Sequence, residues 1–382
     1  MSSDATKART QRDVVRSALD ASRDPGVFSS LLRRLKEAST ELGRKAVLME
    51  VCGSHTWVIS HTGIRDLLFD QVDLISGPGC PVCVTSAGEI RRMVELARKP
   101  GVIAATYGDM LRVPGPLGSL EAARAEGHRV EVVYSAMDVL ELARANPFSQ
   151  VVFLGIGFET TAPSSAVLLK VAREQRVPNF SLYSAHKLMP EALRAILFAK
   201  DFAVDGLILP GHVSAVTGRR YFDFVGRDYG VAAAISGFEA CDVLYGVLRL
   251  IQKLSSGDRT VENCYPRAVS EDGNTRAMAT LREAFEATTG SWRGLGEIPG
   301  SALAVAGDFE EFDAVKRYGL PLLSEEPEPP GCGCAQVLTG RIRPRDCPLF
   351  GKVCSPSRPV GPCMVSSEGS CRAHYVSGRW ER

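Results

Sequence analysis

The chain has 382 residues, of which 45% are hydrophobic and 23% are charged, and its formal net charge is +1. This length predicts two or three domains, and the composition is that of a folded globular protein rather than a disordered or fibrous one. A net charge so close to zero provides no field that would attract nucleic acid or an anionic membrane. Uninterrupted apolar runs stay well below the roughly eighteen residues that a membrane-spanning helix needs.

The N-terminal segment MSSDATKARTQRDVVRSALDASRD is polar and lacks the apolar core of a secretory signal. We therefore expect a cytoplasmic protein, in which disulfides are rarely structural. The chain nevertheless has 11 cysteines. Cys241 and Cys264 stand alone and are expected to be ordinary thiols. The other nine form a group of three and a group of six, and these groups need another explanation.

Residues 27–42 place apolar side chains at helical spacing and predict a helix. An alternation of short apolar runs and helix-length segments follows. The runs that we predict as strands are KAVLMEV, VDLIS, GVIAATY, VEVVYS, VVFLGIG, FSLYS, GLILPG and VAAAISG. The segments between them that we predict as helices include GEIRRMVELAR, SLEAARAEG, SSAVLLKVAREQ, PEALRAILFA and ACDVLYGVLRLIQKL. This alternation predicts an α/β fold with mainly parallel strands and helices on both faces.

Eight strands can form one large sheet or two smaller ones, and a faint likeness between IGFETTA and ISGFEAC favours two. From about residue 260 the alternation fades. TRAMATLREAFEATT keeps a helical pattern, but the tail that follows it is rich in Pro, Gly and Cys. Such a segment needs a stabilising cross-link in order to fold. We therefore predict an N-terminal extension with a helix, two α/β domains and a cysteine-rich C-terminal domain, at residues 1–45, 46–145, 146–260 and 261–382.

Several predicted strands are followed directly by residue types that bind ligands. KAVLMEV leads into CGSH and VDLIS into GPGCPVC in the first α/β domain, and VVFLGIG leads into FETT and GLILPG into HVS in the second. Gly, Ser and Thr also make loops and helix caps, so one such loop says little. In open parallel sheets ligands bind beyond the carboxyl ends of the strands, so these loops together predict a binding site there.

Six cysteines lie in the tail, and their spacing predicts a metal centre. Cys347, Cys354 and Cys371 are separated by six and sixteen residues, and either Cys332 or Cys334 can supply a fourth thiolate. Zinc ribbons usually present two tight Cys-x2-4-Cys pairs, and this tail has one tight pair only. The wide spacing therefore favours an iron–sulfur cluster over zinc, with free thiols in a loop-rich tail as the third possibility.

The N-terminal group has a different pattern. Cys80 and Cys83 form a Cys-x-x-Cys after a strand, which is typical of a redox dithiol, with half of a metal site as the alternative. Cys52 and His55 also follow a strand and can share a metal such as iron, although such a histidine is more often merely packed. No phosphate loop, G-x-G-x-x-G after the first strand, H-E-x-x-H or G-x-S-x-G is present, so nucleotide-binding and hydrolase functions are not indicated.

The motifs together resemble those of the HypD family of [NiFe]-hydrogenase maturation proteins. The likeness runs from about residue 27 to the end of the chain, in order. It is carried by CGSH (52–55), GPGCPVC (77–83), GFETT (157–161), LPGHVS (209–214), CPLFGKVC (347–354) and GPCMVSSEG (361–369). The resemblance implies two facing α/β domains plus a third domain that holds a [4Fe–4S] cluster.

The resemblance also implies roles for the candidate residues. Cys52 becomes a ligand of the iron that carries CN and CO, with His55 and His212 as candidates near that iron. Cys80 and Cys83 become the redox dithiol, and Glu159 and Thr160 are candidate residues for contacting the bound group. The implied ligands of the [4Fe–4S] cluster are Cys332, Cys347, Cys354 and Cys371, with Cys334 as the alternative to Cys332.

In function, the resemblance implies a redox-active scaffold rather than a conventional turnover enzyme. On it the Fe(CN)2CO unit of the hydrogenase is assembled, together with a small HypC-type chaperone and a HypE-type cyanide donor. We expect a monomer when free, with no nucleic-acid or membrane partner. An iron–sulfur-dependent disulfide oxidoreductase acting on another thiol is the alternative, but such an enzyme has no evident need for Cys52 and His55.

Overall fold

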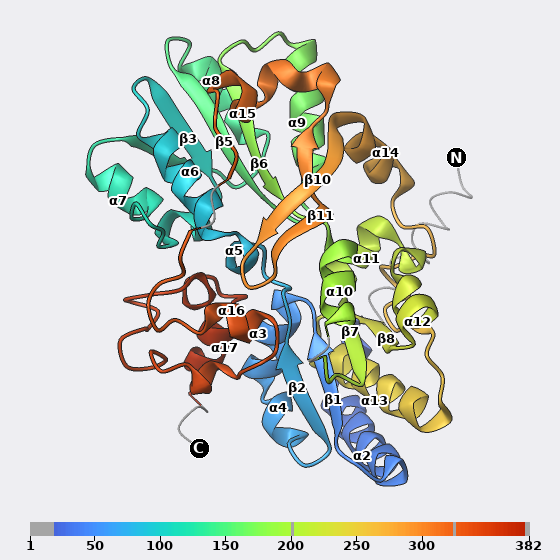
Figure 1. The fold of residues 1–382 in the computed structure, drawn as a ribbon. Helices are drawn as coiled ribbons and strands as arrows, with labels where there is room; N and C mark the ends of the chain where they lie inside the picture. The colour runs from blue at the N-terminus through green and yellow to red at the C-terminus, as the bar shows by residue number, and fades with distance from the viewer. Residues whose placement is uncertain (1–18, 200–201, 324–325, 379–382) are drawn as a thin grey trace, which may run out of the picture. The chain divides into compact units, whose positions relative to one another are not determined.

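The computed structural model describes residues 19–199, 202–323 and 326–378 (Figure 1). In these ranges the predicted α/β alternation is present, and most of the sheet pairing is parallel. None of the helices that the structure describes is long and apolar enough to cross a membrane.

The chain divides into two compact units, each built from two separate stretches of sequence. Unit 1 comprises residues 1–75 and 203–273, and unit 2 comprises residues 76–202 and 274–382. Unit 1 contains one sheet and unit 2 contains two, and each unit has its own core of buried apolar side chains.

Unit 1 contains a five-stranded sheet with the order β2-β1-β7-β8-β9. The pairings β1–β7, β7–β8 and β8–β9 are parallel, so the residues that follow β1, β7 and β8 lie at one edge of the sheet. The strands are β1 (Ala46–Glu50), β2 (Val72–Ser76), β7 (Gly206–Pro210), β8 (Ala232–Ser236) and β9 (Val261–Asn263). The helices are α2 (Pro25–Leu42), α3 (Gly53–Thr62), α4 (Ile64–Leu67), α11 (Gly211–Thr217), η2 (Arg219–Phe222), α12 (Phe224–Tyr229) and α13 (Ala240–Ser256).

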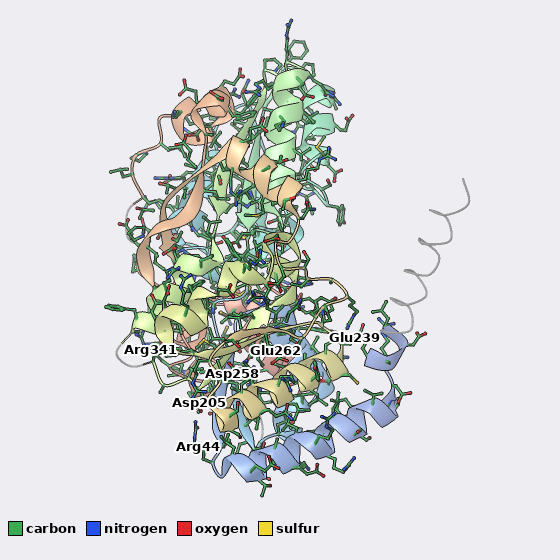
Figure 2. The ribbon with its side chains drawn as sticks, turned by 90° about the vertical axis from the view of Figure 1, so that its right-hand side faces the viewer. Arg44, Asp205, Glu239, Asp258, Glu262 and Arg341 are labelled. Carbon is green, nitrogen blue, oxygen red and sulfur yellow. A yellow bond between two sulfur atoms is a disulfide. The ribbon has the colours of Figure 1, made fainter. Side chains whose placement is uncertain are left out.

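Helix α2 shows how local sequence and packing agree in unit 1. It begins directly after Asp24, whose carboxylate accepts hydrogen bonds from two backbone N–H groups of the first turn. Its apolar face is buried, and the helix contacts α13. Just after α2, Arg44 donates to both carboxylate oxygens of Asp205 at 2.7 and 2.8 Å (Figure 2). This ion pair joins the two stretches of sequence that build unit 1.

Unit 2 contains a four-stranded parallel sheet, with the order β4-β3-β5-β6, and a two-stranded antiparallel sheet, β10-β11. The strands are β3 (Val102–Thr106), β4 (Arg129–Val132), β5 (Gln150–Gly157), β6 (Phe180–His186), β10 (Phe285–Trp292) and β11 (Gly296–Val305). The helices before β10 are α5 (Pro81–Val84), α6 (Ala87–Ala97), η1 (Gly108–Arg112), α7 (Leu120–Ala125), α8 (Asp138–Ala145), α9 (Ala162–Glu174), α10 (Met189–Phe198) and α14 (Thr275–Ala284). Those after β11 are η3 (Gly307–Phe312), α15 (Ala314–Arg317), α16 (Cys334–Leu338), η4 (Pro344–Asp346), η5 (Pro362–Met364) and α17 (Ser370–Val376).

The eight predicted strands are present as β1 to β8, and they form two parallel sheets. Their division between the sheets differs from the consecutive segments 46–145 and 146–260. Strands β7 and β8 pair beside β1, whereas β3 and β4 pair with β5 and β6. The chain thus leaves the first sheet after β2, builds the second sheet, and returns. Parallel neighbours need long crossovers in any case, and here one crossover contains all four strands of the second parallel sheet.

The C-terminal part differs in two ways from the prediction. The helix predicted over TRAMATLREAFEATT ends at Ala284, and the residues from Phe285 to Trp292 form strand β10 instead. The buried Phe285 and the β-branched Thr288 and Thr289 suit a strand. Pairing with β11 then favours the strand over the predicted helix. Residues 274–382 also group with unit 2, so a separate C-terminal domain is not distinguished.

Candidate metal and redox sites

Three predicted site residues of unit 1 lie where parallel strands end. Cys52 is the N-terminal cap of α3, two residues after β1, and His55 is in the first turn of the same helix. His212 is in the first turn of α11, which follows β7 directly. Because β1 and β7 pair in parallel, the sheet brings the loops that carry these residues to the same edge.

Phe238, in the turn after β8, connects the two histidines. The His55 ring stacks on the Phe238 ring with centroids 4.8 Å apart and planes tilted by 24°. The His212 ring stacks on Phe238 as well, at 3.7 Å and 19°. Three strand-end loops therefore contribute to one aromatic cluster in unit 1.

The two histidines differ in their surroundings. His55 is fully buried, and its Nε2 lies 3.0 Å from the carbonyl oxygen of Gly237 and 3.3 Å from that of Ser236. Burial lowers the pKa of His55 to about 4, so the ring is neutral at pH 7. His212 is exposed on one side, and burial of its remaining surface lowers its pKa. Cys52 is buried, and it interacts with another group of the protein.

In unit 2 Cys80 and Cys83 are joined by a disulfide, with their Cα atoms 5.2 Å apart. Cys80 caps the short helix α5, and its sulfur accepts a hydrogen bond from the backbone N–H of Cys83 at 3.2 Å. The backbone after α5 pairs with β10 through a bridge between Thr85 and Trp292. Helix α5 also contacts β5 and η5, and η5 contains Cys363. The disulfide is thus part of the same unit as the cysteine-rich tail and packs beside one of its turns.

Glu159 and Thr160 follow β5 in unit 2. Glu159 is fully buried, and its carboxylate accepts a hydrogen bond from the backbone N–H of Met189 at 2.9 Å. Because Met189 is the first residue of α10, Glu159 stabilises the start of that helix. Thr160 is partly buried. The structure therefore gives Glu159 a structural contact that the sequence did not reveal.

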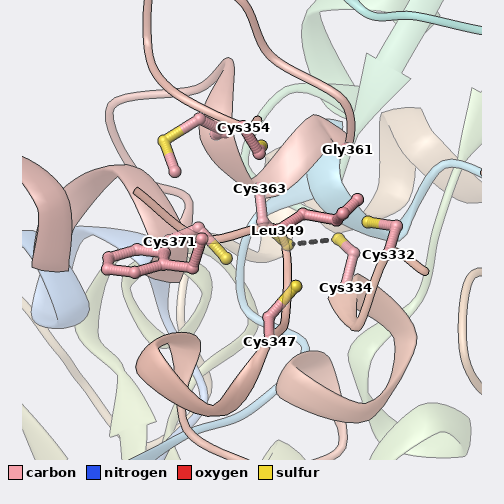
Figure 3. Close-up of a pocket in the computed structure, with 10 residues that line it drawn as sticks. Cys332, Cys334, Cys347, Leu349, Cys354, Gly361, Cys363 and Cys371 are labelled. Atoms are coloured by element: carbon pink, nitrogen blue, oxygen red, sulfur yellow. Dashed lines mark hydrogen bonds between the residues drawn. The ribbon is translucent and has the colours of Figure 1, made fainter. Parts of the chain in front are cut away.

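The six tail cysteines line one pocket in unit 2 (Figure 3). Apolar side chains close it, namely those of Leu349, Phe350 and Met364. Cys332 is partly buried and the other five cysteines are buried. Gly361 also lines the pocket, where an added Cβ would come within 2.7 Å of the Cys332 sulfur, so the close approach of the chain requires glycine here.

The sulfur atoms of this pocket are not equivalent. Those of Cys334 and Cys363 lie only 2.6 Å apart, as the dashed line in Figure 3 marks. Hydrogen bonds with Cys332 and Cys363 hold the pKa of the Cys334 thiol well below its usual range, and the contact with Cys334 raises the pKa of Cys363. The sulfurs of Cys347 and Cys354 accept backbone N–H groups at 3.3 Å instead, from Gly333 and Val360.

Hydrogen bonds to cysteine sulfurs are one of the factors that set the reduction potential of an iron–sulfur cluster. Among the residues that the structure describes, no group of three or more His, Cys, Asp or Glu is arranged to hold a single metal ion. The four cysteines of a [4Fe–4S] cluster bind four different irons, so they need not converge on one point. The donor chemistry of the pocket fits such a cluster.

Two further features of the sites were not found from the sequence. Phe238 carries no ligand-type group, so only its place in ISGFEAC, after a predicted strand, could have drawn attention to it. In unit 2 the loop after β3 contacts the tail, since the Ser366 hydroxyl donates to the Asp109 carboxylate at 2.7 Å. The sequence stretch GVIAATYGD ends in that aspartate, but nothing in it indicated a serine partner 257 residues away.

Comparison with known proteins agrees with these motifs. The HypD profile, described as the hydrogenase formation hypA family, matches residues 27–378. The HypD hydrogenase maturation factor of Azotobacter vinelandii is 45% identical over 373 residues, covering 94% of this chain and 97% of the relative. Those of Escherichia coli K12 and Rhodobacter capsulatus are 41% and 40% identical, and the matches cover 94% and 93% of this chain and 97% of each relative. The chain therefore belongs to the HypD family of hydrogenase maturation factors.

Proposed function

We propose that this protein is the scaffold on which the Fe(CN)2CO unit of a [NiFe]-hydrogenase is assembled, with a small HypC-type chaperone and a HypE-type cyanide donor. The observation that carries the proposal is that Cys52, His55 and His212 all follow β1 or β7, whose parallel pairing brings the loops after them to one edge of the unit 1 sheet. Thiolate and imidazole are both donors that suit iron. The iron is cargo, which the scaffold holds and then passes on.

Cys52 is the first iron donor in this proposal. Its position as the cap of α3 fixes the sulfur at the end of a buried strand, where the sheet restricts its movement. A thiolate is soft and suits a low-valent iron, whereas a serine alkoxide is hard and rarely ionised at neutral pH. His212 is exposed, so an incoming partner or ligand can reach that side of the cluster.

The disulfide of unit 2 supplies the redox chemistry. Reduction of the Cys80–Cys83 bond takes up two electrons and two protons and yields two thiols. Reoxidation returns the electron pair, which suits the reductive steps of ligand assembly. Cys80 caps the four-residue helix α5 and Cys83 lies within it, so both sulfurs stay near bonding distance in either state.

The tail pocket is the proposed site of a [4Fe–4S] cluster. Cys334 and Cys363 lie close enough to form a pair with each other, which leaves Cys332, Cys347, Cys354 and Cys371 as the ligands. Buried surroundings, apolar neighbours and N–H groups directed at two of the sulfurs all favour a thiolate-bound centre. Such a cluster supplies single electrons when bound.

Iron content in the complex with the chaperone tests the scaffold. We would purify the full-length protein anaerobically with its small partner and count the iron above that of the cluster. The Cys52→Ser variant should lose this extra iron, whereas Cys241→Ser, which changes a buried thiol elsewhere in unit 1, should keep it. Equal extra iron in both variants would refute the assignment of Cys52.

An iron–sulfur-dependent thiol oxidoreductase is the second candidate. The contact of α5 with η5, which places a disulfide beside the cysteine-rich tail, favours it. Such an enzyme would reduce a thiol substrate equally well after the Cys52→Ser change. A scaffold would instead lose hydrogenase maturation in the cell with that same change, so one variant separates the two functions.

A further inference from the structure

The turn Ser236-Gly237-Phe238 after β8 controls the chemistry of His55 through its backbone. The Nε2 atom of His55 lies 3.0 Å from one carbonyl oxygen of this turn and 3.3 Å from another. Carbonyl oxygens only accept hydrogen bonds, so Nε2 must carry the hydrogen and donate it. In the neutral ring Nδ1 then keeps its lone pair. This atom is buried and has no hydrogen-bond partner in the described part of the chain.

The same turn controls the orientation of both imidazoles. Phe238 has one histidine ring stacked at 4.8 Å and another at 3.7 Å, each tilted by less than 25° from its plane. Tyr265 meets the Phe238 ring edge-on, with centroids 6.1 Å apart and planes at 85°. Contacts of this kind are worth more than their buried area alone, and they are directional. Phe238 is therefore held in place by three rings.

The turn itself has little freedom to move. An added Cβ on Gly237 would come within 2.6 Å of the Tyr265 ring, so glycine is required for the carbonyl to approach His55. Behind Tyr265, the Arg267 guanidinium lies over the ring at 4.6 Å from its centroid. The buried Asp242 accepts hydrogen bonds from Arg267 and from the backbone N–H of Glu239. This chain of contacts fixes the aromatic cluster from the side of β8 and α13.

We propose that Phe238 is a positioning residue of the iron site, which holds the His55 and His212 imidazoles stacked on its ring while the Gly237 carbonyl leaves Nδ1 as the one nitrogen of His55 that can interact with iron or its ligands. This inference rests on the proposed binding of iron at Cys52. In this arrangement the N–H of His55 is not available to a bound ligand, because it is already donated to the backbone.

Substitutions of Phe238 separate positioning from simple packing. Phe238→Leu keeps apolar bulk but removes the flat faces, so we expect iron affinity at Cys52 to fall by roughly tenfold or more, as for other residues that orient metal ligands. Phe238→Tyr keeps the faces and should bind iron within about twofold of wild type. Phe224→Leu is the matched control, since it removes an aromatic contact with Tyr229 in the same unit.

The experiment is an anaerobic titration of the full-length, cluster-containing protein with ⁵⁷Fe(II), followed by Mössbauer spectroscopy of the added iron. Weakened binding in Phe238→Leu, with near-normal binding in Phe238→Tyr and Phe224→Leu, supports the inference. Normal binding in Phe238→Leu beside lost binding in Cys52→Ser overturns it and leaves the scaffold function intact. Normal binding in Cys52→Ser refutes the scaffold assignment, and the inference falls with it.

The tautomer of His55 can be measured in the wild-type protein, so this test does not depend on whether a Phe238 variant folds. Long-range ¹H–¹⁵N spectra of histidine-labelled wild-type protein distinguish the two ring nitrogens, and His55→Gln assigns the signals among the 6 histidines of the chain. We expect His55 to carry its hydrogen on Nε2. A hydrogen on Nδ1 would overturn the inference whatever the iron titration shows.

Discussion

In the proposed function, the unit 1 site and the tail pocket of unit 2 both present sulfur to iron, but they do so in opposite ways. Unit 1 combines one buried thiol with two imidazoles, of which one is exposed. The tail pocket holds six cysteines among apolar side chains, and five of the six are buried. A mixed and partly open donor set suits a metal that arrives and leaves, whereas a closed set of thiolates suits a metal centre that stays. In the proposal, the first site therefore holds cargo and the second site holds a resident cofactor.

The largest effect should come from the tail pocket. Anaerobically purified protein should contain about four irons and four sulfides in that pocket. Cys347→Ala or Cys354→Ala should abolish the brown absorbance, because each removes a sulfur that backbone N–H groups support. Cys363→Ala should keep the absorbance if Cys363 pairs with Cys334. Iron and sulfide analysis decides this. Stoichiometric zinc in place of iron would show that the pocket does not hold an iron–sulfur cluster.

A smaller effect is expected at the disulfide of unit 2. Cys83→Ser should abolish hydrogenase maturation but lower the free energy of unfolding only modestly, because the disulfide closes a very short loop. Wild-type Cys80 and Cys83 should interconvert between dithiol and disulfide across the range of glutathione potentials. Thiol alkylation followed by mass spectrometry checks this. A pair that stays reduced throughout that range would have no role as an electron donor.

The smallest expected effect is a pH dependence of stability that depends on buried histidines. His186 is buried in unit 2, its Nε2 lies 2.9 Å from the Ser165 hydroxyl, and burial lowers its pKa from 6.5 to about 4. In this window the unfolded chain binds the proton and the folded chain does not, so stability rises with pH between about 4 and 6.5.

Urea denaturation at several pH values measures this effect. Each such histidine adds at most about 1.4 kcal/mol per pH unit, and His55 behaves in the same way in unit 1. His186→Gln should reduce the slope of the unit 2 transition and leave that of unit 1 unchanged. An unchanged slope for both units would show that folding does not lower the pKa of His186.

The sequence predicted the elements of both units better than their assembly. Eight strands were found because each is a short apolar run between turn residues and a helical pattern. The return of β7 and β8 to the sheet of β1 was missed, because pairing between residues about 160 positions apart leaves no local pattern. The β10–β11 hairpin was missed because a helical pattern continues directly into its first strand.

For the sites, the sequence identified the residues but not their contacts. Cysteines and histidines after strands attract attention by their chemistry alone, and all six tail cysteines line one pocket. Phe238 has no such chemistry, and the tautomer of His55 depends on a backbone carbonyl that every residue type possesses. The pairing of Cys334 with Cys363 also depends on how the loops fold, because 28 residues separate them in the chain.

The most direct test of the central claim is an infrared spectrum of the anaerobically purified protein with its small partner. We expect bands in the CN and CO stretching regions for wild type and for Cys241→Ser. These bands should be lost in Cys52→Ser, while the brown absorbance of the tail pocket remains, and they should be weaker in His212→Ala. CN and CO bands of normal intensity in Cys52→Ser would contradict the account, because the iron would then be bound elsewhere and the division between cargo site and cofactor site would be wrong.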